Sequence, residues 1–143
     1  MNSDTGYMRI ALEEARSGAL EGEIPVGAVA VFEGRVIARA HNRVESLRDA
    51  SAHAETTVLK AASSVLDRWR LTGVTLYVTI EPCPMCAMAL VLSRVDRVVF
   101  GAPEPRTGAA GSFIHILGNP ALNHRPEFLG GVLSDEASAL LRE

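Results

Sequence analysis

The segment from residue 74 to residue 100 constrains the fold most, because it predicts two strands and a helix in close succession. Residues 74–80 and 95–100 are valine-rich runs, as is typical of strands. Between them, residues 84–93 predict a helix with a proline in its first turn, where the missing N–H leaves no hydrogen bond unmade. A strand, a helix and a strand within so few residues predict a right-handed parallel crossover. The segment therefore favours an α/β fold.

Helices and strands are also predicted on both sides of this segment. Small and apolar residues recur every three or four positions from residue 7 to residue 20, which predicts an amphipathic helix. Residues 26–32 and 35–41 are strand-like runs joined by Glu33-Gly34, a pair that suits a tight hairpin. The first run is apolar on both faces, which favours an interior strand.

The remaining residues predict loops and three further elements. A polar loop at 42–50 precedes Ser51, which predicts the cap of a helix that ends near residue 64. The last part of the chain predicts a Pro/Gly-rich loop, a helical turn, a short strand and a final helix, at residues 103–112, 113–117, 127–132 and 134–142.

The complete pattern predicts one domain, residues 1–143, with a three-layer α/β/α fold in which helices flank a mixed five-stranded sheet. A chain of this length buries roughly 70% of the surface that its unfolded form exposes, which is enough for one core. No apolar run is long enough to span a membrane, and residues 1–6 do not resemble a signal peptide, so we expect a cytoplasmic protein without membrane contact. The net charge of −3 means that any contact with nucleic acid must be local.

The only two cysteines of the sequence, Cys83 and Cys86, lie at the start of the helix predicted after a strand. Two cysteines placed at random in this length would lie three apart about once in seventy cases. Residues i and i+3 of a helix start point the same way, so two thiolates can take neighbouring corners of a tetrahedral zinc site. The helix dipole there also favours the thiolate form. The pair therefore indicates either metal binding or redox chemistry of the thioredoxin-like kind.

A second motif, His53-Ala54-Glu55, favours the metal, because it opens another predicted helix that a dithiol enzyme does not need. Alone, a His-x-Glu triplet is expected by chance in roughly half of such chains. A structural zinc site normally has a fourth protein ligand, and the other histidines are in no metal-binding pattern. His53, Cys83 and Cys86 would leave one coordination position for water, as catalytic zinc requires. A redox or structural zinc module is the non-enzymatic alternative.

The two motifs together resemble the signature of the cytidine deaminase superfamily, whose members are zinc-dependent deaminases. The likeness extends, in order, over nearly the whole chain to bacterial tRNA-specific adenosine deaminases. The metal motifs are common to the superfamily, whereas residues 107–112 and 123–125 point to the tRNA branch. The segments that carry the likeness are Ile24-Pro-Val-Gly-Ala28, His41-Asn-Arg43, Ala52-His-Ala-Glu55, Leu76-Tyr-Val-Thr-Ile-Glu-Pro-Cys83, Ser93-Arg94, Val98-Val-Phe-Gly101, Thr107-Gly-Ala-Ala-Gly-Ser112 and Asn123-His-Arg125.

This resemblance implies a homodimeric, cytoplasmic hydrolase that converts adenosine to inosine at the wobble position of a tRNA anticodon stem-loop, with arginine tRNA as the expected substrate. His53, Cys83 and Cys86 would hold zinc (Zn2+). Because two thiolates cancel the charge of the zinc, the metal acidifies its water less than a three-histidine site does, and a nearby base is needed. Glu55 would be that base: it would take a proton from the zinc-activated water, deliver it to the adenine ring and later protonate the departing ammonia.

The resemblance also implies three substrate-binding residues, Asn42, Arg106 and Asn123. The amide of Asn42 can donate and accept, which suits an adenine edge. Arg106 belongs to the loop at 103–112, which either meets phosphates or forms a tight surface turn. In this loop Glu104 stands where many relatives have aspartate. Trp69, between two arginines, resembles a base-stacking platform, although a partly buried anchor is the favoured interpretation.

The end of the sequence departs from the tRNA branch, in which a final helix commonly has aromatic and basic residues. Here residues 140–143 are Leu-Leu-Arg-Glu. The alternative function is a zinc-dependent deaminase of a free nucleobase or nucleoside, such as guanine or cytosine, with the same fold. A basic groove that leads to the zinc would favour RNA, and a closed pocket would favour a free base.

Overall fold

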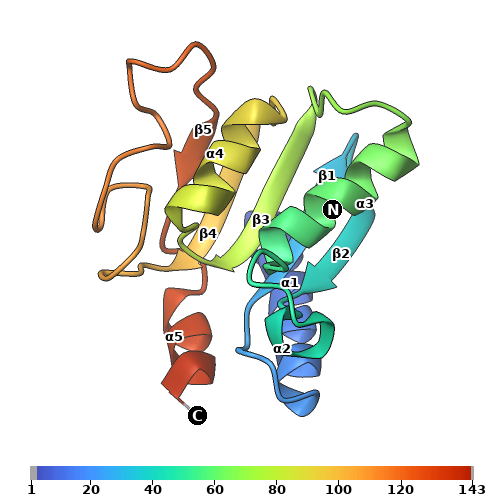
Figure 1. The fold of residues 1–143 in the computed structure, drawn as a ribbon, viewed down its shortest axis with the longest axis vertical. Coiled ribbons are helices and arrows are strands. Elements are labelled where there is room, and N and C mark those ends of the chain that lie inside the picture. Colours follow the sequence, from blue (N-terminus) through green and yellow to red (C-terminus); the bar gives the residue numbers. More distant parts are fainter. Residues whose placement is uncertain (1–2, 143) are drawn as a thin grey trace.

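A β-hairpin and a parallel β-α-β unit share one sheet in the computed structural model, which describes residues 3–142 (Figure 1). The first strand pairs antiparallel with both of its neighbours, whereas the last three strands run parallel to one another. The sheet is therefore mixed and five-stranded, which confirms the sequence prediction. In their order across the sheet, the strands are β2 (Arg35–His41), β1 (Gly27–Phe32), β3 (Val74–Ile80), β4 (Arg97–Ala102) and β5 (Glu127–Leu129).

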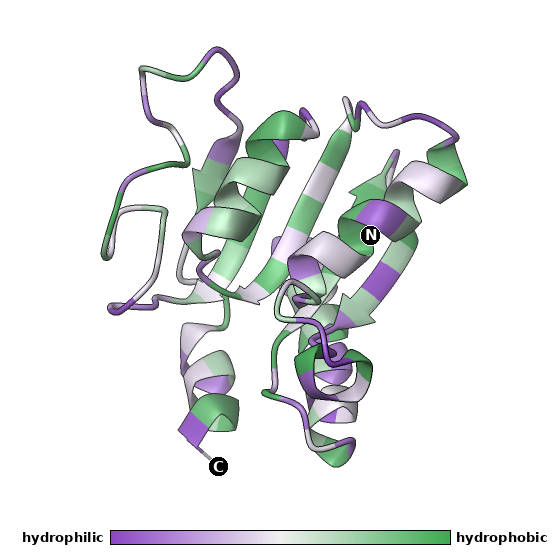
Figure 2. Cartoon of the chain, viewed as in Figure 1, coloured by the Kyte–Doolittle hydropathy of each residue, from purple (hydrophilic) through white to green (hydrophobic). Residues whose placement is uncertain are grey.

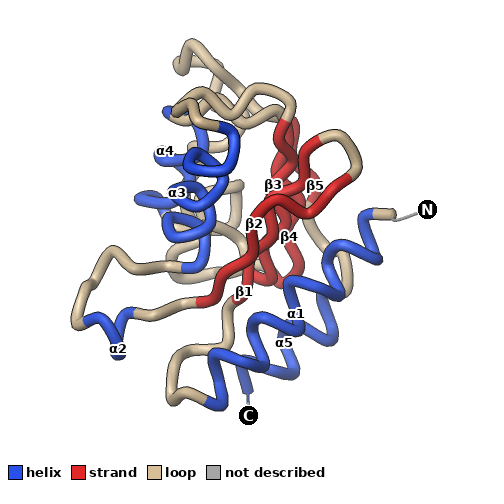
Figure 3. The backbone as a smooth tube through the Cα atoms, turned by 90° about the vertical axis from the view of Figure 1, so that its right-hand side faces the viewer, coloured by secondary structure: helices blue, strands red, loops and turns tan. Residues whose placement is uncertain are grey.

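Helices cover both faces of this sheet, so that the molecule has the predicted three layers. Figure 3 shows α1 and α5 on one face, and α3 and α4 on the other. A short helix, α2, lies in the connection between β2 and α3. In the described part of the chain the helices are α1 (Asp4–Leu20), α2 (Val44–Leu47), α3 (Ala54–Leu66), α4 (Pro84–Leu92) and α5 (Ser134–Arg142).

The hairpin between β1 and β2 follows from its two turn residues. Glu33 and Gly34 have φ angles of 52° and 76°, the left-handed conformation at both turn positions that matches the twist of a two-residue hairpin. β1 lies between β2 and β3, and its first five residues are buried. The predictions of a tight hairpin and of an interior strand are both confirmed.

The larger core lies between the sheet and the layer formed by α3 and α4. Leu90 and Val91 of α4 are buried in one cluster with Leu76 of β3 and Val98 of β4. Figure 2 shows hydrophobic residues concentrated along these strands and along α4. Each fully buried leucine or valine side chain contributes roughly 1.5–3 kcal/mol, so this packing fixes where α4 begins relative to the end of β3.

The structure differs from the sequence prediction at the start of α3. Helix α3 begins at Ala54 with His53 as its N-cap, not at Ser51. The Ser51 hydroxyl instead donates to a carboxylate oxygen of Asp49 at 2.7 Å, and the Ser51 N–H donates to the same oxygen at 2.9 Å. Ser51 therefore stabilises the preceding turn, and the histidine occupies the exact position where the helix starts.

Four other differences concern loops and the end of the last strand. The predicted helical turn at 113–117 is irregular and contains an isolated bridge between Ala110 and His115. The predicted loop at 42–50 contains α2, and β5 ends before Gly130. Trp69 is 60% exposed, so its interpretation as a partly buried anchor is wrong; the Arg70 guanidinium lies over its ring at 5.1 Å. None of the helices formed by residues 3–142 is both long and apolar enough to cross a membrane.

Candidate active site

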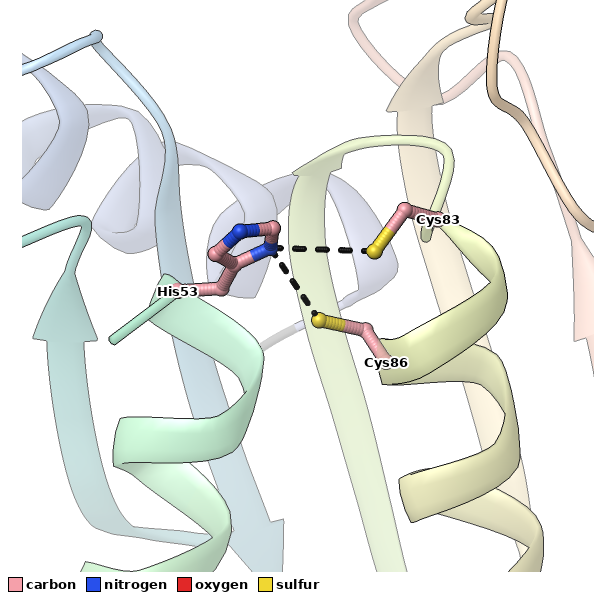
Figure 4. Close-up of side chains that lie close together, drawn as sticks. All are labelled: His53, Cys83 and Cys86. Carbon is pink, nitrogen blue, oxygen red and sulfur yellow. Dashed lines mark hydrogen bonds between the residues drawn. The ribbon is translucent and has the colours of Figure 1, made fainter. Parts of the chain in front are cut away.

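The first residues of α3 and α4 bring a histidine and two cysteines together (Figure 4). His53 is the N-cap of α3, Cys83 is the N-cap of α4, and Cys86 lies in the first turn of α4. The Nδ1 atom of His53 lies 3.4 Å from Sγ of Cys86 and 3.7 Å from Sγ of Cys83. The three ligand atoms all lie within 4.8 Å of one another.

These distances fit a tetrahedral zinc ion. With Zn–N near 2.0 Å and Zn–S near 2.3 Å, tetrahedral angles place a nitrogen and a sulfur ligand about 3.5 Å apart. The two observed N···S distances, 3.4 and 3.7 Å, lie on either side of that value. Within residues 3–142 the group contains these three ligands and no fourth one. The donor set therefore fits a zinc ion that keeps a position open for a small ligand.

The two cysteines have different proton affinities. A hydrogen bond with the thiol of Cys86, followed by other contacts that include His53, lowers the pKa of Cys83 to about 5. The same hydrogen bond and burial raise the pKa of Cys86 far above its usual range. The surroundings therefore favour the thiolate form at Cys83, and a cation between the two sulfurs would favour loss of the proton from Cys86 as well.

Glu55 lies in the first turn of α3 and is buried beside this group. Burial is the main cause that raises the pKa of Glu55 to about 7, and the negative charge of Cys83 adds to it. A carboxyl group whose pKa is close to neutral can both accept and donate a proton under physiological conditions. Glu55 lines the same pocket as His53 and Cys83, so its carboxyl group lies where it could exchange protons with a ligand bound there.

A pocket of about 740 Å3 opens in front of the metal-binding group. Its volume is in the range of sites that hold small molecules or single nucleosides. Several carboxylates border the pocket, and among the described residues that line it there is no lysine or arginine. The lining residues are Gly22, Ile24, Val26, Asn42, Val44, Glu45, Ala50, His53, Ala54, Glu55, Ile80, Glu81, Cys83, Glu104 and Thr107.

The three predicted substrate-binding residues are placed differently from one another. Asn42 lines the pocket at the end of β2 and is buried. The Arg106 side chain is 89% exposed, and its Nε lies 3.4 Å from a carboxylate oxygen of Glu104. Asn123 is exposed in the loop before β5. Neither Arg106 nor Asn123 lines the pocket, so they could contact only a substrate that extends beyond it.

Sequence reasoning assigned no role to two buried glutamates that adjoin the pocket, Glu23 and Glu81. Glu23 precedes Ile24, which lines the pocket, and Glu81 immediately precedes Pro82-Cys83. A charged residue directly at the end of the buried strand β3 is the signal that could have identified Glu81, because an unpaired carboxylate is rarely buried without hydrogen bonds.

Comparison with known proteins places this geometry in a family. Residues 1–102 match the family model described as the cytidine and deoxycytidylate deaminase zinc-binding region. The chain is 48% identical, over 99% of its length and 88% of the relative's, to the tRNA-specific adenosine deaminase of Bacillus subtilis.

Two solved structures have the same fold. One, from a study of A-to-I editing by tRNA:A34 deaminases at the wobble position of transfer RNA, superposes with a TM-score of 0.92 at 43% identity, covering 96% of this chain and 99% of that chain. Another, the guanine deaminase from Nitrosomonas europaea, has a TM-score of 0.86 at 28% identity, covering 99% and 84%. The chain therefore belongs to the cytidine and deoxycytidylate deaminase family and, within that family, to the tRNA-specific adenosine deaminases.

Proposed function

We propose that the protein hydrolyses the 6-amino group of adenosine at the wobble position of a tRNA anticodon and leaves inosine. The observation that carries the proposal is the three-ligand group of His53, Cys83 and Cys86 with the buried Glu55 beside it, in a pocket of nucleoside size that His53, Cys83 and Glu55 help to line. Membership of the tRNA-specific adenosine deaminases supports the choice of adenosine and of tRNA.

The chain's own residues account for the proton transfers of this reaction. His53, Cys83 and Cys86 would hold zinc, which supplies a water of lowered pKa when it is bound. The Glu55 carboxylate accepts a proton from the attacking water, delivers it to N1 of adenine, and transfers the second proton to the departing amine. Water and adenosine give inosine and ammonia, so Glu55 ends the cycle in its starting state. A pKa of about 7 suits both directions of transfer.

We expect the base of the substrate to bind inside the pocket and its phosphates to bind outside it. The Asn42 side chain, which can donate and accept, is proposed to bind the adenine edge inside the pocket. A phosphate inside would lie among the carboxylates of Glu45, Glu81 and Glu104 without a cation, which is unfavourable. The phosphates of the substrate are therefore expected outside the pocket, where Arg106 and Asn123 are exposed. This division suits a base that is flipped out of a larger RNA.

A second candidate is a deaminase of a free nucleobase. The acidic lining of the pocket and the likeness to a guanine deaminase favour it, because an uncharged base needs no cation. The higher identity to tRNA-specific enzymes favours the RNA substrate.

Arginine tRNA as the particular substrate, the cytoplasm as its location and a homodimer as the active form are parts of the same proposal. The dimer is supported by an exposed apolar seam on α4: Met85 and Leu92 lie seven residues apart, on one face of the helix, and are 39% and 59% exposed. A second copy of the chain could cover them.

The test is a panel of substrates offered to zinc-analysed protein. We expect inosine at the wobble position of a minimal arginine-tRNA anticodon stem-loop, and no product from free guanine, cytosine or adenosine. Turnover of a free base without turnover of the stem-loop would replace this proposal with the second candidate.

A further inference from the structure

Two buried glutamates, Glu81 in the lining of the pocket and Glu23 next to the pocket-lining Ile24, make no ion pair within the described residues. Glu81 is 2% exposed and Glu23 is 5% exposed. A buried carboxylate costs several kcal/mol unless its oxygens are hydrogen-bonded. The partners of each carboxylate therefore indicate what it stabilises.

All the donors to Glu81 come from the loop that follows β4. Its Oε1 accepts from the backbone N–H of Glu104 at 3.1 Å and from the Ser112 hydroxyl. Its Oε2 accepts from the backbone N–H groups of Ala110 at 2.8 Å and Ser112 at 3.2 Å. This loop has no helix or strand of its own, so Glu81 supplies the acceptors that a regular element would otherwise supply.

Glu23 holds the helix α2 in the same way. Its Oε1 accepts from the backbone N–H of Glu45 at 3.1 Å, and its Oε2 accepts from the N–H of Ser46 at 2.7 Å and from the Ser46 hydroxyl. A four-residue helix has few internal hydrogen bonds, so these contacts fix its position against the segment around Ile24.

The hydrogen bonds of Glu23 and those of Glu81 involve the same kinds of donor, and they hold two segments that line the same pocket. Each consists of a buried carboxylate, at least two backbone N–H groups and one serine hydroxyl. The Glu23 contacts join residues 22–26 to α2, and the Glu81 contacts join the end of β3 to the loop with Glu104 and Thr107. Figure 1 shows α2 below the start of α3, and the loop after β4 on the far side of α4.

The Glu81 contacts also link the pocket wall to the metal-binding group. Glu81 lies two residues before Cys83, and the carbonyl of the intervening Pro82 accepts from the Ala109 N–H at 2.8 Å. A Cβ atom at Gly108 would overlap the Glu81 carboxylate, so a glycine is needed for the loop to approach this closely.

Both carboxylates are stabilised in their ionised form. Burial raises the pKa of Glu81, but the hydrogen bonds from Ser112, Glu104 and Ala110 outweigh it and hold the pKa below its usual range. The hydrogen bond from the Ser46 hydroxyl is the main cause that lowers the pKa of Glu23.

We propose that Glu23 and Glu81 are positioning residues, which fix the two walls of the substrate pocket relative to the metal-binding group through hydrogen bonds to the backbone of α2 and of the loop at 103–112. They act on the affinity for the base, not on the proton transfers that Glu55 performs. The kinetic part of this inference rests on the proposed function; the structural part does not.

The substitutions Glu81→Gln and Glu23→Gln test this with little change in volume. An amide NH2 in place of Oε2 of Glu81 would face two N–H donors, and in place of Oε1 it would face the Glu104 N–H. In Glu23→Gln either orientation likewise puts the NH2 against a backbone N–H. Each variant therefore leaves at least one buried donor unpaired. Ser112→Ala and Ser46→Ala are milder variants, which lose only the hydroxyl, and Glu136→Gln is the matched control on the exposed pair with Arg9.

The first readout is amide hydrogen exchange, which needs no substrate. We expect exchange about tenfold faster at residues 104–112 in Glu81→Gln and at residues 44–47 in Glu23→Gln, each without a change in the other segment. Smaller changes are expected in the serine variants, which remain informative if a glutamine variant does not fold. The second readout is kinetic: on the stem-loop, we expect KM to rise about tenfold, with kcat and the zinc content within about twofold of the wild type.

Unchanged exchange in both segments, or a fall of kcat with loss of zinc at an unchanged KM, would overturn the inference. If the wild-type protein converts a free base and not the stem-loop, the proposed tRNA substrate is wrong. The exchange data still decide whether these glutamates fix the walls of the pocket. KM is then measured with that free base.

Discussion

The imidazole Nδ1 of His53 lies 3.4 Å from Sγ of Cys86, although His53 is the N-cap of α3 and Cys86 lies in the first turn of α4, a different helix on the same face of the sheet. The contact exists because β2 and β3 run in the same direction and end at the same edge of the sheet, where α3 and α4 then begin. The packing of α4 against the sheet fixes the cysteine pair there. The position of each ligand at a helix start follows from the local sequence, whereas their distance follows from the packing of the whole core.

The zinc content of purified variants distinguishes a residue that binds the metal from a residue that only transfers protons. We expect Cys83→Ala to lose the metal, because two remaining ligands hold zinc far more weakly than three. Glu55→Gln is expected to keep one zinc per chain and to lose activity by a factor of about 10²–10⁴, because it removes the proton carrier only. Elemental analysis of both purified variants is the measurement. A zinc-free wild type with a Cys83–Cys86 disulfide would support the redox alternative instead.

Arg106 provides a test of where the phosphates lie. Its exposed guanidinium is expected to contact the RNA backbone outside the pocket, so Arg106→Ala should raise KM for the stem-loop and reduce the slope of log KM against log salt by about one unit. Kinetics at several salt concentrations give this slope. An Arg106→Ala protein with the wild-type KM and slope would mean that the loop at 103–112 is only a surface turn.

Stability at acid pH depends on Asp4. Its carboxylate accepts from Arg97 at 2.7 and 2.8 Å and from the Tyr77 hydroxyl at 2.7 Å, and the hydrogen bonds with Arg97 are the main cause that lowers its pKa below 3.8. In the folded state this group binds fewer protons than in the unfolded state, so its contribution is complete above pH 3.8 and is lost as pH falls through the lowered pKa.

The variant Asp4→Asn is therefore expected to unfold at a lower urea concentration than the wild type at pH 7, and the difference should shrink below pH 3.8. Urea titrations at a series of pH values measure it. A difference that stays constant down to the acid end would exclude the ion pair as its cause.

Gly27 marks where α1 contacts β1 most closely. A Cβ atom there would overlap the carbonyl of Ala11 and lie 2.6 Å from the backbone nitrogen of Ala15. We expect Gly27→Ala to lower the free energy of unfolding by about 1–3 kcal/mol, because the helix must move away from the sheet. Gly34→Ala is the control for backbone strain without a clash: φ is 76° there and a Cβ meets nothing within 4 Å. Equal losses in the two variants would contradict the packing explanation.

The sequence predicts most of the fold because its signals are local. The valines of β3, the proline at the start of α4 and the Glu33-Gly34 turn each act within a few residues, and the structure has these elements where they were expected. The start of α3 could not be predicted as well, because Ser51 had two possible partners and the turn at Asp49 was favoured over the helix.

The candidate site, like the fold, could be predicted from the sequence only where its signals are local. The residues that could hold a metal are predicted from spacing within two short motifs, whereas the contacts of Glu23 and Glu81 join residues more than twenty positions apart in the chain. Such contacts leave no periodic pattern in the sequence. The exposure of Trp69 was also unpredictable, since it depends on whether another element covers the loop after α3.

Deamination of an arginine-tRNA anticodon stem-loop by zinc-analysed protein in water labelled with oxygen-18 tests the proposed hydrolysis most directly. We expect inosine at the wobble position that carries the label at O6, and no product from the zinc-loaded Glu55→Gln variant. An unmodified wobble adenosine after prolonged incubation with zinc-loaded wild-type protein would contradict the proposed function.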